Sequence, residues 1–354
     1  MVIDIEPEEV KEISLEDVKE LQLMLAAVDR EEEAKRRKNK IKVLLLYIVY
    51  PLAMGTYFRR ALERRTDVDL KVAGVYTGSW IPWMGGMTLP EKYAKPIDLP
   101  LPFSPNIGEI NYDLVKAQLG DWKPDIIINV DAGLHWKYKP ADGMVVTVGT
   151  DPHVLNDFYD TPRKYSDLFF NMQYVYSRGA DFYLPYAYDP TVHYPTDGVP
   201  SIQNGEASIE YVQKDTDAVL IGMPYESRVQ WVAALRAKGV SVLFENGPVF
   251  DEYRKINNRA RIGLNWSSLD DLNARAYELA AMKLAPVMNV VTDLERSGIE
   301  CATFTTLPEA VEAVIYLKEN DKARIELAEL AYRSVQGETY DKRVNTILQM
   351  AGLI

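Results

Sequence analysis

The chain has 354 residues, of which 47% are hydrophobic and 26% charged, and its formal net charge is −12. This length and composition are typical of a globular protein with two domains, and the acidic balance argues against a general nucleic-acid-binding surface, though not against a local basic groove. One cysteine, Cys301, excludes an internal disulfide framework and a cysteine-based zinc site. No apolar run reaches membrane-spanning length and the acidic N-terminus is unlike a signal peptide, so we expect a cytoplasmic protein.

Residues 1–40 differ from the rest of the chain. The run from Ser14 to Asp17 resembles a capping box, apolar residues then recur at helical spacing, and a highly charged stretch follows, acidic first and basic later. We therefore predict a charged N-terminal helical extension. It packs either on the main body or on a partner subunit, or else serves as a specific binding tail, and the sequence favours packing.

Residues 41–205 alternate strand and helix patterns. Strands are predicted at residues 41–50, 70–76, 124–130, 144–148 and 173–176, with helices at 56–65, 111–122 and 161–170. The alternation indicates a parallel, doubly wound α/β sheet. The turn after the first strand has no GxGxxG pattern, so a nicotinamide or flavin enzyme is disfavoured.

A long loop, residues 77–105, carries Trp80 and Trp83 among glycine and methionine residues. Such loops often line a binding cleft, and sugars and bases both stack on tryptophan. The alternative is a loop tucked under a small hydrophobic cluster. The sequence does not decide between the two.

Acid and base candidates follow two predicted strands of this region. Asp131 and His135 come after strand 124–130, and Asp151 and His153 after strand 144–148. Ligands of open α/β sheets bind beyond the carboxyl ends of the strands, so these side chains fall on the productive edge. We predict them as catalytic candidates, Asp151 first. The alternative is that Asp151 only caps a turn before Pro152, with His153 as its neighbour.

After a linker that ends near residue 205, the pattern of a second α/β domain covers residues 206–335. Strands are predicted at residues 218–222, 240–244, 262–265 and 285–291, and helices at 228–238, 307–320 and 321–334. A last helix starts near residue 339 and runs to the end of the chain. The three histidines of the whole chain show no metal-ligand spacing, so we expect no metal site.

The most informative stretch is a strand, a polar loop and a helix at residues 262–281. The opening of a helix after a strand directs main-chain N–H groups and a positive dipole end at one point, which suits the phosphates of a nucleotide. Arg275 adds a forked donor for a diphosphate, and Glu278, one turn further on, is placed for ribose hydroxyls. The alternative is an ordinary α/β unit whose Arg275 and Glu278 lie on a solvated helix face.

The same residues carry a family resemblance. The run N-x-R-x-Y-E-L-A-A that begins at Asn273, followed by A-P-V at residues 285–287, resembles the donor-site signature of glycosyltransferases of the GT-B fold. It is most similar to the spore-maturation-type, CgeB-like group. Three further stretches resemble that group in the same order: the L-P-x-A-x-D-P-x-x-H-x-P run at residues 184–195, Gly222 followed by Arg228, and the T-Y-x-x-R run at residues 339–343. The resemblance covers roughly residues 41–354.

Two departures from the family pattern stand out. Asp270 and Glu278 match a pair of acidic residues eight positions apart, but aspartate replaces the usual glutamate at the first. The family generally has glycine where this chain has Lys283 or Leu284. Both departures lie beside the expected sugar-binding turn.

The resemblance implies two facing Rossmann-like domains, with a C-terminal helix at residues 336–354 packing back across them. It implies a nucleoside-diphosphate sugar as co-substrate, with no permanently bound cofactor and no metal. We expect the second domain to bind this donor through Gly222, Arg228, Asp270, Asn273, Arg275 and Glu278. The first domain would hold the acceptor near Trp80, Trp83 and His135.

Three other functions stay open. A glycosyltransferase acting on modified DNA bases needs a basic, aromatic-lined groove in the first domain, and Trp80 and Trp83 are the only residues that support such a groove. A nucleotide-sugar epimerase would share the fold, and a non-catalytic sugar-nucleotide-binding protein would keep the donor site alone. The sugar, the nucleotide, the acceptor, the stereochemistry and the oligomeric state are not readable from the sequence.

Overall fold

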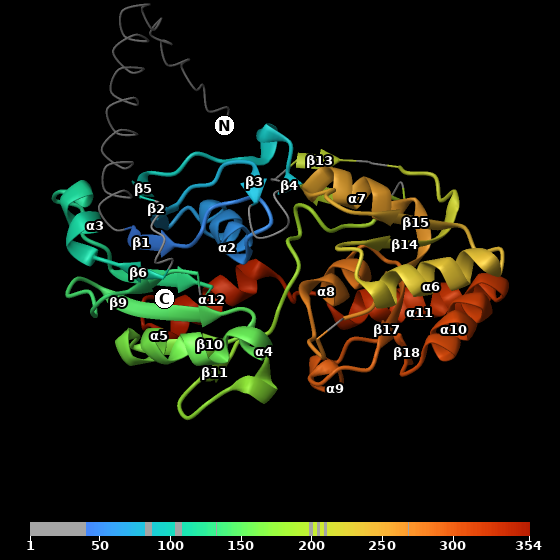
Figure 1. The fold of residues 1–354 in the computed structure, drawn as a ribbon. Helices are drawn as coiled ribbons and strands as arrows, with labels where there is room; N and C mark the ends of the chain where they lie inside the picture. Colours follow the sequence, from blue (N-terminus) through green and yellow to red (C-terminus); the bar gives the residue numbers. More distant parts are fainter. Residues whose placement is uncertain are drawn as a thin grey trace, which may run out of the picture.

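The computed structural model describes residues 40–81, 87–102, 108–131, 133–197, 201–203, 206–208, 211–267 and 269–354. The predicted N-terminal helix and Trp83 lie outside these residues. Figure 1 shows two α/β halves side by side, the first in blue and green and the second in yellow, orange and red. The last helix, drawn in red, lies with the first half although it ends the chain.

The first half is built on a sheet of parallel strands, as predicted. Across the sheet the order is β11 (Phe182–Tyr183), β10 (Leu168–Asn171), β9 (Met144–Gly149), β7 (Ile126–Val130), β1 (Ile41–Leu46), β2 (Val68–Val75), β5 (Leu99–Leu101). In the interior strand β1, Val43 and Leu45 pack into a different cluster from Leu44 and Leu46. Both faces of this strand are therefore buried, which explains its continuous apolar run.

Short helices and ladders surround this sheet. They are α2 (Met54–Glu63), η2 (Glu91–Tyr93), α3 (Tyr112–Leu119), α4 (Pro152–Leu155), η3 (Asn156–Tyr159), α5 (Asp160–Tyr165) and η4 (Tyr174–Tyr176), with the pairs β3 (Trp80–Ile81) and β4 (Met87–Thr88), and β6 (Glu109–Ile110) and β8 (His135–Trp136). The helix α2 follows β1, and α4 follows β9. Both helices therefore begin at the carboxyl edge of the sheet, where ligands of this fold class bind.

The prediction of a helix at residues 161–170 was wrong in its second half. Helix α5 ends at Tyr165, and strand β10 begins at Leu168. The Ser166 hydroxyl donates a hydrogen bond to the Pro162 carbonyl at 2.7 Å and closes the helix, while Phe169 and Phe170 enter the sheet and are buried. The predicted strand at residues 173–176 is instead the 3₁₀ turn η4.

The second half has a smaller parallel sheet, again as predicted. Its order is β15 (Val242–Glu245), β14 (Thr216–Ile221), β16 (Ala260–Asn265), β17 (Ala285–Asn289), β18 (Ala302–Phe304). Its helices are α6 (Glu226–Ala237), α7 (Phe250–Asn258), α8 (Ala274–Ala281), α9 (Leu294–Ser297), α10 (Leu307–Glu319) and α11 (Asp321–Ser334). Helix α7 and strand β18 were not predicted. A hairpin of β12 (Ser201–Gln203) and β13 (Glu206–Ser208) lies in the connection between the halves.

The last helix, α12 (Tyr340–Met350), returns to the first half, as predicted. Its N-cap Thr339 accepts a hydrogen bond from the Lys342 amide, and the Tyr340 ring stacks on Tyr57 of α2 with centroids 5.1 Å apart. Arg64 joins α2 to α12 through Asp341 at 2.6 Å. None of the helices in the described part of the chain is long and apolar enough to cross a membrane.

Candidate functional site

A cavity of about 510 Å³ lies between the two halves, at the carboxyl ends of strands from both sheets. From the second half it is lined by five of the predicted donor residues, Gly222, Arg228, Asn273, Arg275 and Glu278. From the first half it is lined by two of the predicted catalytic residues, Asp151 and His153. The structure thus gathers into one cavity residues that are more than a hundred positions apart in the chain.

Two arginines face each other over a glycine on the second-half wall. A Cβ atom placed on Gly222 would lie 2.4 Å from Nη2 of Arg275 and 3.2 Å from Nη1 of Arg228. Neither guanidinium forms an ion pair with any described carboxylate; Arg228 donates to the carbonyls of Trp266 and Met223 at 2.9 and 3.0 Å. Burial, together with the charge of Arg275, lowers the pKa of Arg228 to about 10. The two guanidinium groups beside Gly222 would stabilise a bound anion.

The first turn of α8 adds main-chain donors to the same wall. Its N-cap Asn273 makes no side-chain cap; its amide group pairs instead with Asn265, with Nδ2 to Oδ1 distances of 3.1 and 3.3 Å. Asn265 also accepts from Nη1 of Arg275 at 3.1 Å, which fixes that guanidinium beside the helix start. Asn273 and Ala274 line the cavity, so the positive end of α8 is directed at it.

Glu278 lines the cavity and is buried, with 8% of its surface exposed. The hydroxyl of Tyr253 donates to its Oε2 at 2.8 Å, and Nε2 of His193 lies 3.6 Å from its Oε1. The alternative of a solvated helix face is therefore wrong for Glu278. Sequence reasoning missed Tyr253, which comes from the unpredicted helix α7; the helical spacing of Phe250, Tyr253 and Asn257 was the only local signal.

Asp151 and His153 form the polar part of the first-half wall. The hydroxyl of Thr150 donates to Oδ2 of Asp151 at 3.2 Å, and the amide nitrogen of Gln173 lies 3.2 Å from Nδ1 of His153. Asp151 precedes α4 but makes no side-chain cap, so capping does not account for its carboxylate. Burial raises the pKa of Asp151, and the nearby charge of Asp271 adds to the rise. A carboxylate with a raised pKa is a stronger general base.

The predicted donor residue Asp270 lies outside the cavity, and its neighbour Asp271 lines it. Asp270 has a left-handed backbone, φ 51°, and its carboxylate accepts from the amide and hydroxyl of Thr292 at 3.0 and 2.8 Å. Asp271 instead accepts a short hydrogen bond from Ser267, which also lines the cavity. Because of the turn at Asp270, the acidic side chain that lines the cavity is that of Asp271, one residue after the predicted position.

Three other predicted residues are not among those that line the cavity. Asp131 directly follows β7 and has φ 82°, and His135 lies in the β6–β8 pair with its ring against Gly108. Burial lowers the pKa of His135. Trp80 is half exposed on β3, and Trp83 lies outside the described residues. The structure therefore brings the other donor candidates together with Asp151 and His153, but not with Asp270, Asp131 or the described acceptor candidates.

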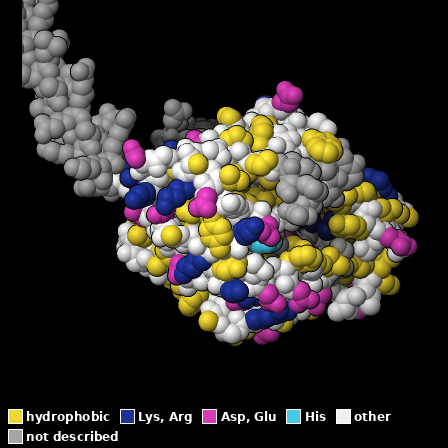
Figure 2. Space-filling model, turned by 60° about the vertical axis from the view of Figure 1, so that its left-hand side comes forward, with side chains coloured by type: hydrophobic (Ala, Val, Ile, Leu, Met, Phe, Trp, Pro, Cys, Tyr) yellow, Lys and Arg dark blue, Asp and Glu magenta, His cyan; other side chains and the backbone are white. Residues whose placement is uncertain are grey.

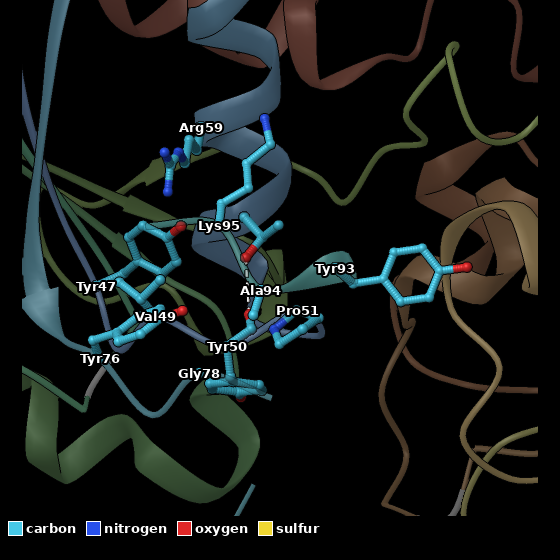
Figure 3. A pocket seen from close by; sticks show the side chains of 11 residues that line it. Tyr47, Val49, Tyr50, Pro51, Arg59, Tyr76, Gly78, Tyr93, Ala94 and Lys95 are labelled. Carbon is cyan, nitrogen blue, oxygen red and sulfur yellow. Dashed lines mark hydrogen bonds between the residues drawn. The ribbon is translucent and has the colours of Figure 1, made fainter. Parts of the chain in front are cut away.

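A second, much smaller hollow lies beside α2, beyond β1 and β2 (Figure 3). Its walls include Tyr47, Tyr76, Arg59 and Lys95, and Tyr93 points away from it. Its volume of about 10 Å³ corresponds to about one water molecule. This hollow is too small for a sugar or a nucleotide, so we place the candidate site in the large cavity.

The described surface carries mixed charges. On the face shown in Figure 2, Lys and Arg side chains are interspersed with Asp and Glu. Within the described ranges, no group of three His, Cys, Asp or Glu side chains is arranged to hold a metal ion.

Comparison with known proteins agrees with this architecture. Residues 212–349, which include the second-half wall of the cavity, match a protein family described as "Glycosyl transferase-like". No curated protein matches the sequence.

Solved structures match nearly the whole chain at low sequence identity. Sucrose-phosphate synthase from Thermosynechococcus elongatus superposes with a TM-score of 0.57 at 11% identity, over 88% of this chain and 98% of that one. An alpha-glucosyltransferase solved with UDP and a 13-mer DNA gives 0.56 at 10%, over 88% and 99%. A UDP-N-acetylglucosamine 2-epimerase gives 0.52 at 12%, over 89% and 98%. The chain has the GT-B fold, as the sequence predicted.

Proposed function

We propose that the protein is a glycosyltransferase that moves a sugar from a nucleoside-diphosphate sugar to an acceptor hydroxyl. The observation that carries the proposal is the pair Arg228 and Arg275 over Gly222, two cations without a carboxylate partner among the described residues, beside the N-terminus of α8. The match of residues 212–349 to a glycosyl transferase-like family supports it.

Within this proposal the second domain, residues 206–335, binds the donor. Arg228, Arg275 and the first-turn amides of α8 bind the diphosphate, and Glu278 accepts hydrogen bonds from the ribose. Asp271, rather than Asp270, faces the sugar, because only Asp271 lines the cavity. Negative charge develops on the departing diphosphate, so fixed cationic and N–H donors at that place lower the barrier.

The first domain, residues 41–205, holds the acceptor. Asp151 takes the proton of the acceptor hydroxyl as its oxygen attacks the anomeric carbon, and His153 lies two residues further along the same wall. The finer assignment to the CgeB-like group rests on the four sequence runs alone. The expectations of a cytoplasmic protein that needs neither a metal nor a permanently bound cofactor belong to the same proposal.

Two of the alternatives share the donor site. A nucleotide-sugar epimerase would release free epimerised sugar without an acceptor, and a non-catalytic binding protein would keep the sugar nucleotide intact. The presence of Asp151 on the wall opposite the arginines favours an enzyme over a binding protein, because simple binding needs no base there.

Thermal unfolding in the presence of a panel of sugar nucleotides tests the proposal. A ligand of the native state raises the melting temperature, by an amount set by its concentration relative to Kd. We expect one nucleotide class to raise it and Glu278→Ala to remove most of that rise. Glu326→Ala, on the outer helix α11, should leave the rise unchanged. If no sugar nucleotide shifts the wild-type protein, the proposed function is wrong.

A further inference from the structure

The two walls of the cavity differ in charge. The first-half wall contributes Leu52, Met54, Tyr57, Asp151, His153, Val154 and Tyr186. Among the described lining residues the only lysines or arginines are Arg228 and Arg275, and both belong to the second half. All the permanent positive charge of the described lining residues is thus on the donor side, where the proposed diphosphate would use it; on the first-half wall His153 is the only described side chain that can become a cation.

Apolar side chains are exposed at the mouth of the cavity. Val154 of α4 is 54% exposed, and Leu269, on the loop that precedes α8, is 53% exposed. Tyr225, at the start of α6, is 46% exposed. Exposed aliphatic and aromatic surface that rims a cavity is typical of a place where an apolar ligand packs.

The carboxylates that line the cavity would repel a negatively charged acceptor. Asp151 on the first-half wall and Asp271 on the opposite loop both line the cavity, and burial raises the pKa of Asp151, with the charge of Asp271 adding to the rise. An acceptor that carried phosphate would bring negative charge toward both without meeting a lysine or arginine among the described residues of its own wall. An uncharged hydroxyl avoids this repulsion and still offers its proton to Asp151.

We propose that the acceptor is an uncharged molecule that presents its hydroxyl on an apolar body, an alcohol or phenol, rather than a nucleic acid or a phosphorylated sugar. This inference rests on the proposed function. The acceptor oxygen forms a bond to the anomeric carbon, the bond from that carbon to the diphosphate oxygen breaks with its electron pair, and the hydroxyl proton passes to Asp151.

Matched acceptors test the assignment, with the sugar nucleotide that gives the largest thermal shift as donor. Release of nucleoside diphosphate is measured for two matched pairs of acceptors: glucose against glucose 6-phosphate, and 5-hydroxymethyl-2′-deoxyuridine against a DNA 13-mer that contains this nucleoside. Octyl glucoside and 4-methylumbelliferone are measured alongside them as acceptors with an apolar body and have no phosphate-bearing partner. We expect kcat/KM for each neutral member to exceed that of its phosphate-bearing partner at least about tenfold, a charge discrimination of the size that buried like charges produce.

Val154→Lys introduces a cation at the mouth of the cavity and should reduce the ratio of kcat/KM for neutral acceptors to kcat/KM for phosphate-bearing ones. Lys318→Met is the control and should leave this ratio unchanged, because Lys318 lies on the surface near Gly239. The assignment is overturned if a phosphate-bearing acceptor is used as well as its neutral partner, or if no neutral acceptor raises diphosphate release above hydrolysis of the donor. Failure of the proposed function itself would show earlier, as the absence of any thermal shift with a sugar nucleotide.

A second observation concerns His193, which is 1% exposed. Its Nδ1 accepts a hydrogen bond from the Asp189 amide at 3.1 Å, so the proton of the neutral ring is on Nε2. Burial lowers the pKa of His193, which keeps the ring neutral. Nε2 has no hydrogen-bond partner within the described chain and lies 3.6 Å from Oε1 of Glu278.

His193 is held firmly on the first-half side. The carboxylate of Asp189, which is fully buried, binds Arg60 and Arg64 of the α2 region, and its main chain holds the imidazole. Tyr253 binds the other oxygen of Glu278 at 2.8 Å. The carboxylate of Glu278 thus lies between a donor from the first half and a donor from the second.

We infer that His193 is a positioning residue whose Nε2–H orients Glu278 toward the ribose of the donor. The inference rests on the donor part of the proposed function. It predicts that loss of His193 weakens recognition of the ribose hydroxyls and leaves the diphosphate contacts intact.

The test compares binding of the nucleoside diphosphate preferred among UDP, GDP, ADP, CDP and TDP with binding of its 2′,3′-dideoxy analogue. We expect the wild-type protein to prefer the ribonucleotide about tenfold or more, the size of a hydrogen bond to a charged group. His193→Phe should lose this preference with Kd for the dideoxy analogue unchanged, and His193→Gln, which keeps an N–H donor, should restore part of it. Equal weakening of both ligands by His193→Phe, or an unchanged preference, overturns the inference.

Discussion

The guanidinium groups of Arg228 and Arg275 meet over the main chain of Gly222, and neither has a carboxylate partner among the described residues. Burial disfavours the charged form of Arg228, and repulsion by Arg275 adds to this effect, which is why the pKa of Arg228 falls to about 10. A bound diphosphate would remove both penalties at once. The affinity of the cavity for nucleotides should therefore depend on phosphate charge more than on any other ligand feature.

Replacement of the glycine tests this arrangement directly. Gly222 has φ 151°, and an added Cβ would lie 2.4 Å from Nη2 of Arg275, so Gly222→Ala must displace the guanidinium. We expect the Kd for a nucleoside diphosphate, measured by calorimetry, to rise at least about tenfold, the loss of one charged hydrogen bond. Gly239→Ala is the matched control, because Gly239 has φ 76° and open space around it. Equal effects of the two substitutions on Kd would refute the role of Gly222.

Arg275→Met should separate phosphate recognition from base recognition. The loss of a charged hydrogen-bond donor costs about 1.5–3 kcal/mol, so we expect binding of the nucleoside diphosphate to weaken about tenfold to a hundredfold. Binding of the nucleoside without phosphates should not change. The Kd values of both ligands provide the measurement, with Arg236→Met on the surface of α6 as control. An equal loss for nucleoside and nucleoside diphosphate would show that Arg275 does not act on the phosphates.

The two neighbouring aspartates should behave differently. Asp271→Asn removes a carboxylate that lines the cavity, and we expect transfer, measured as kcat/KM for the donor, to fall at least about tenfold. Asp270→Asn weakens the bonds to Thr292 outside the cavity and should lower the melting temperature while kcat/KM stays within about twofold. The reverse order of effects on kcat/KM would restore Asp270 as the donor residue.

The pH dependence of sugar transfer should follow the ionisation of the Asp151 carboxyl group. A general base must be ionised, so activity is lost as the pH falls through its pKa, and burial places that pKa above the usual range of an aspartate. The acid limb of kcat/KM should therefore lie at higher pH than an exposed aspartate would give. Asp151→Asn should abolish this limb and lower kcat about a hundredfold or more. An acid limb that survives in Asp151→Asn would assign the base elsewhere.

Arg64 should stabilise the fold in a pH-dependent way. Burial alone would raise the pKa of Asp189, but Arg60 and Arg64 outweigh it and hold that pKa below its usual range. The stabilisation is therefore complete above the unfolded pKa of about 4 and is lost as the pH falls through the lower, folded value. We expect Arg64→Met to reduce the free energy of unfolding by about 1–3 kcal/mol at pH 7, and the difference to shrink below pH of about 4. Denaturant titrations at several pH values measure it, and a difference that stays constant with pH would contradict the role of the ion pair.

The sequence predicted the features that local patterns encode. Continuous apolar runs such as that of β7 predicted buried parallel strands, and the spacing of Arg275 and Glu278 placed both on one side of the opening of α8. Features that depend on distant parts of the chain were missed. Tyr253 reaches Glu278 from a different helix of the second half, and His193 reaches it only because the two halves pack together. No spacing within the sequence relates these three residues.

Two other differences between the predictions and the structure have local causes. The left-handed backbone at Asp270 moved the acidic side chain of the cavity by one residue, and such a turn is not encoded by spacing between acidic residues. The helix predicted through Phe170 overlooked the break at Ser166, where a hydroxyl closes the helix on Pro162. Ligand sites on loops are sensitive to such single-residue changes, whereas the strands around them are not.

The position of α12 has a consequence for the order of folding during synthesis. Tyr340, Val344, Ile347 and Leu348 are buried in the same cluster as Val43 and Leu45, at the opposite end of the sequence. A nascent chain that emerges from the ribosome therefore carries an incomplete first half until α12 has been synthesised. The second half has its own core cluster between Ala218 and Ala328, so it can fold earlier. Until α12 is in place, the apolar surface of the first half that this helix covers stays exposed. Protection of that surface by a chaperone during translation would then matter most for the half that is made first.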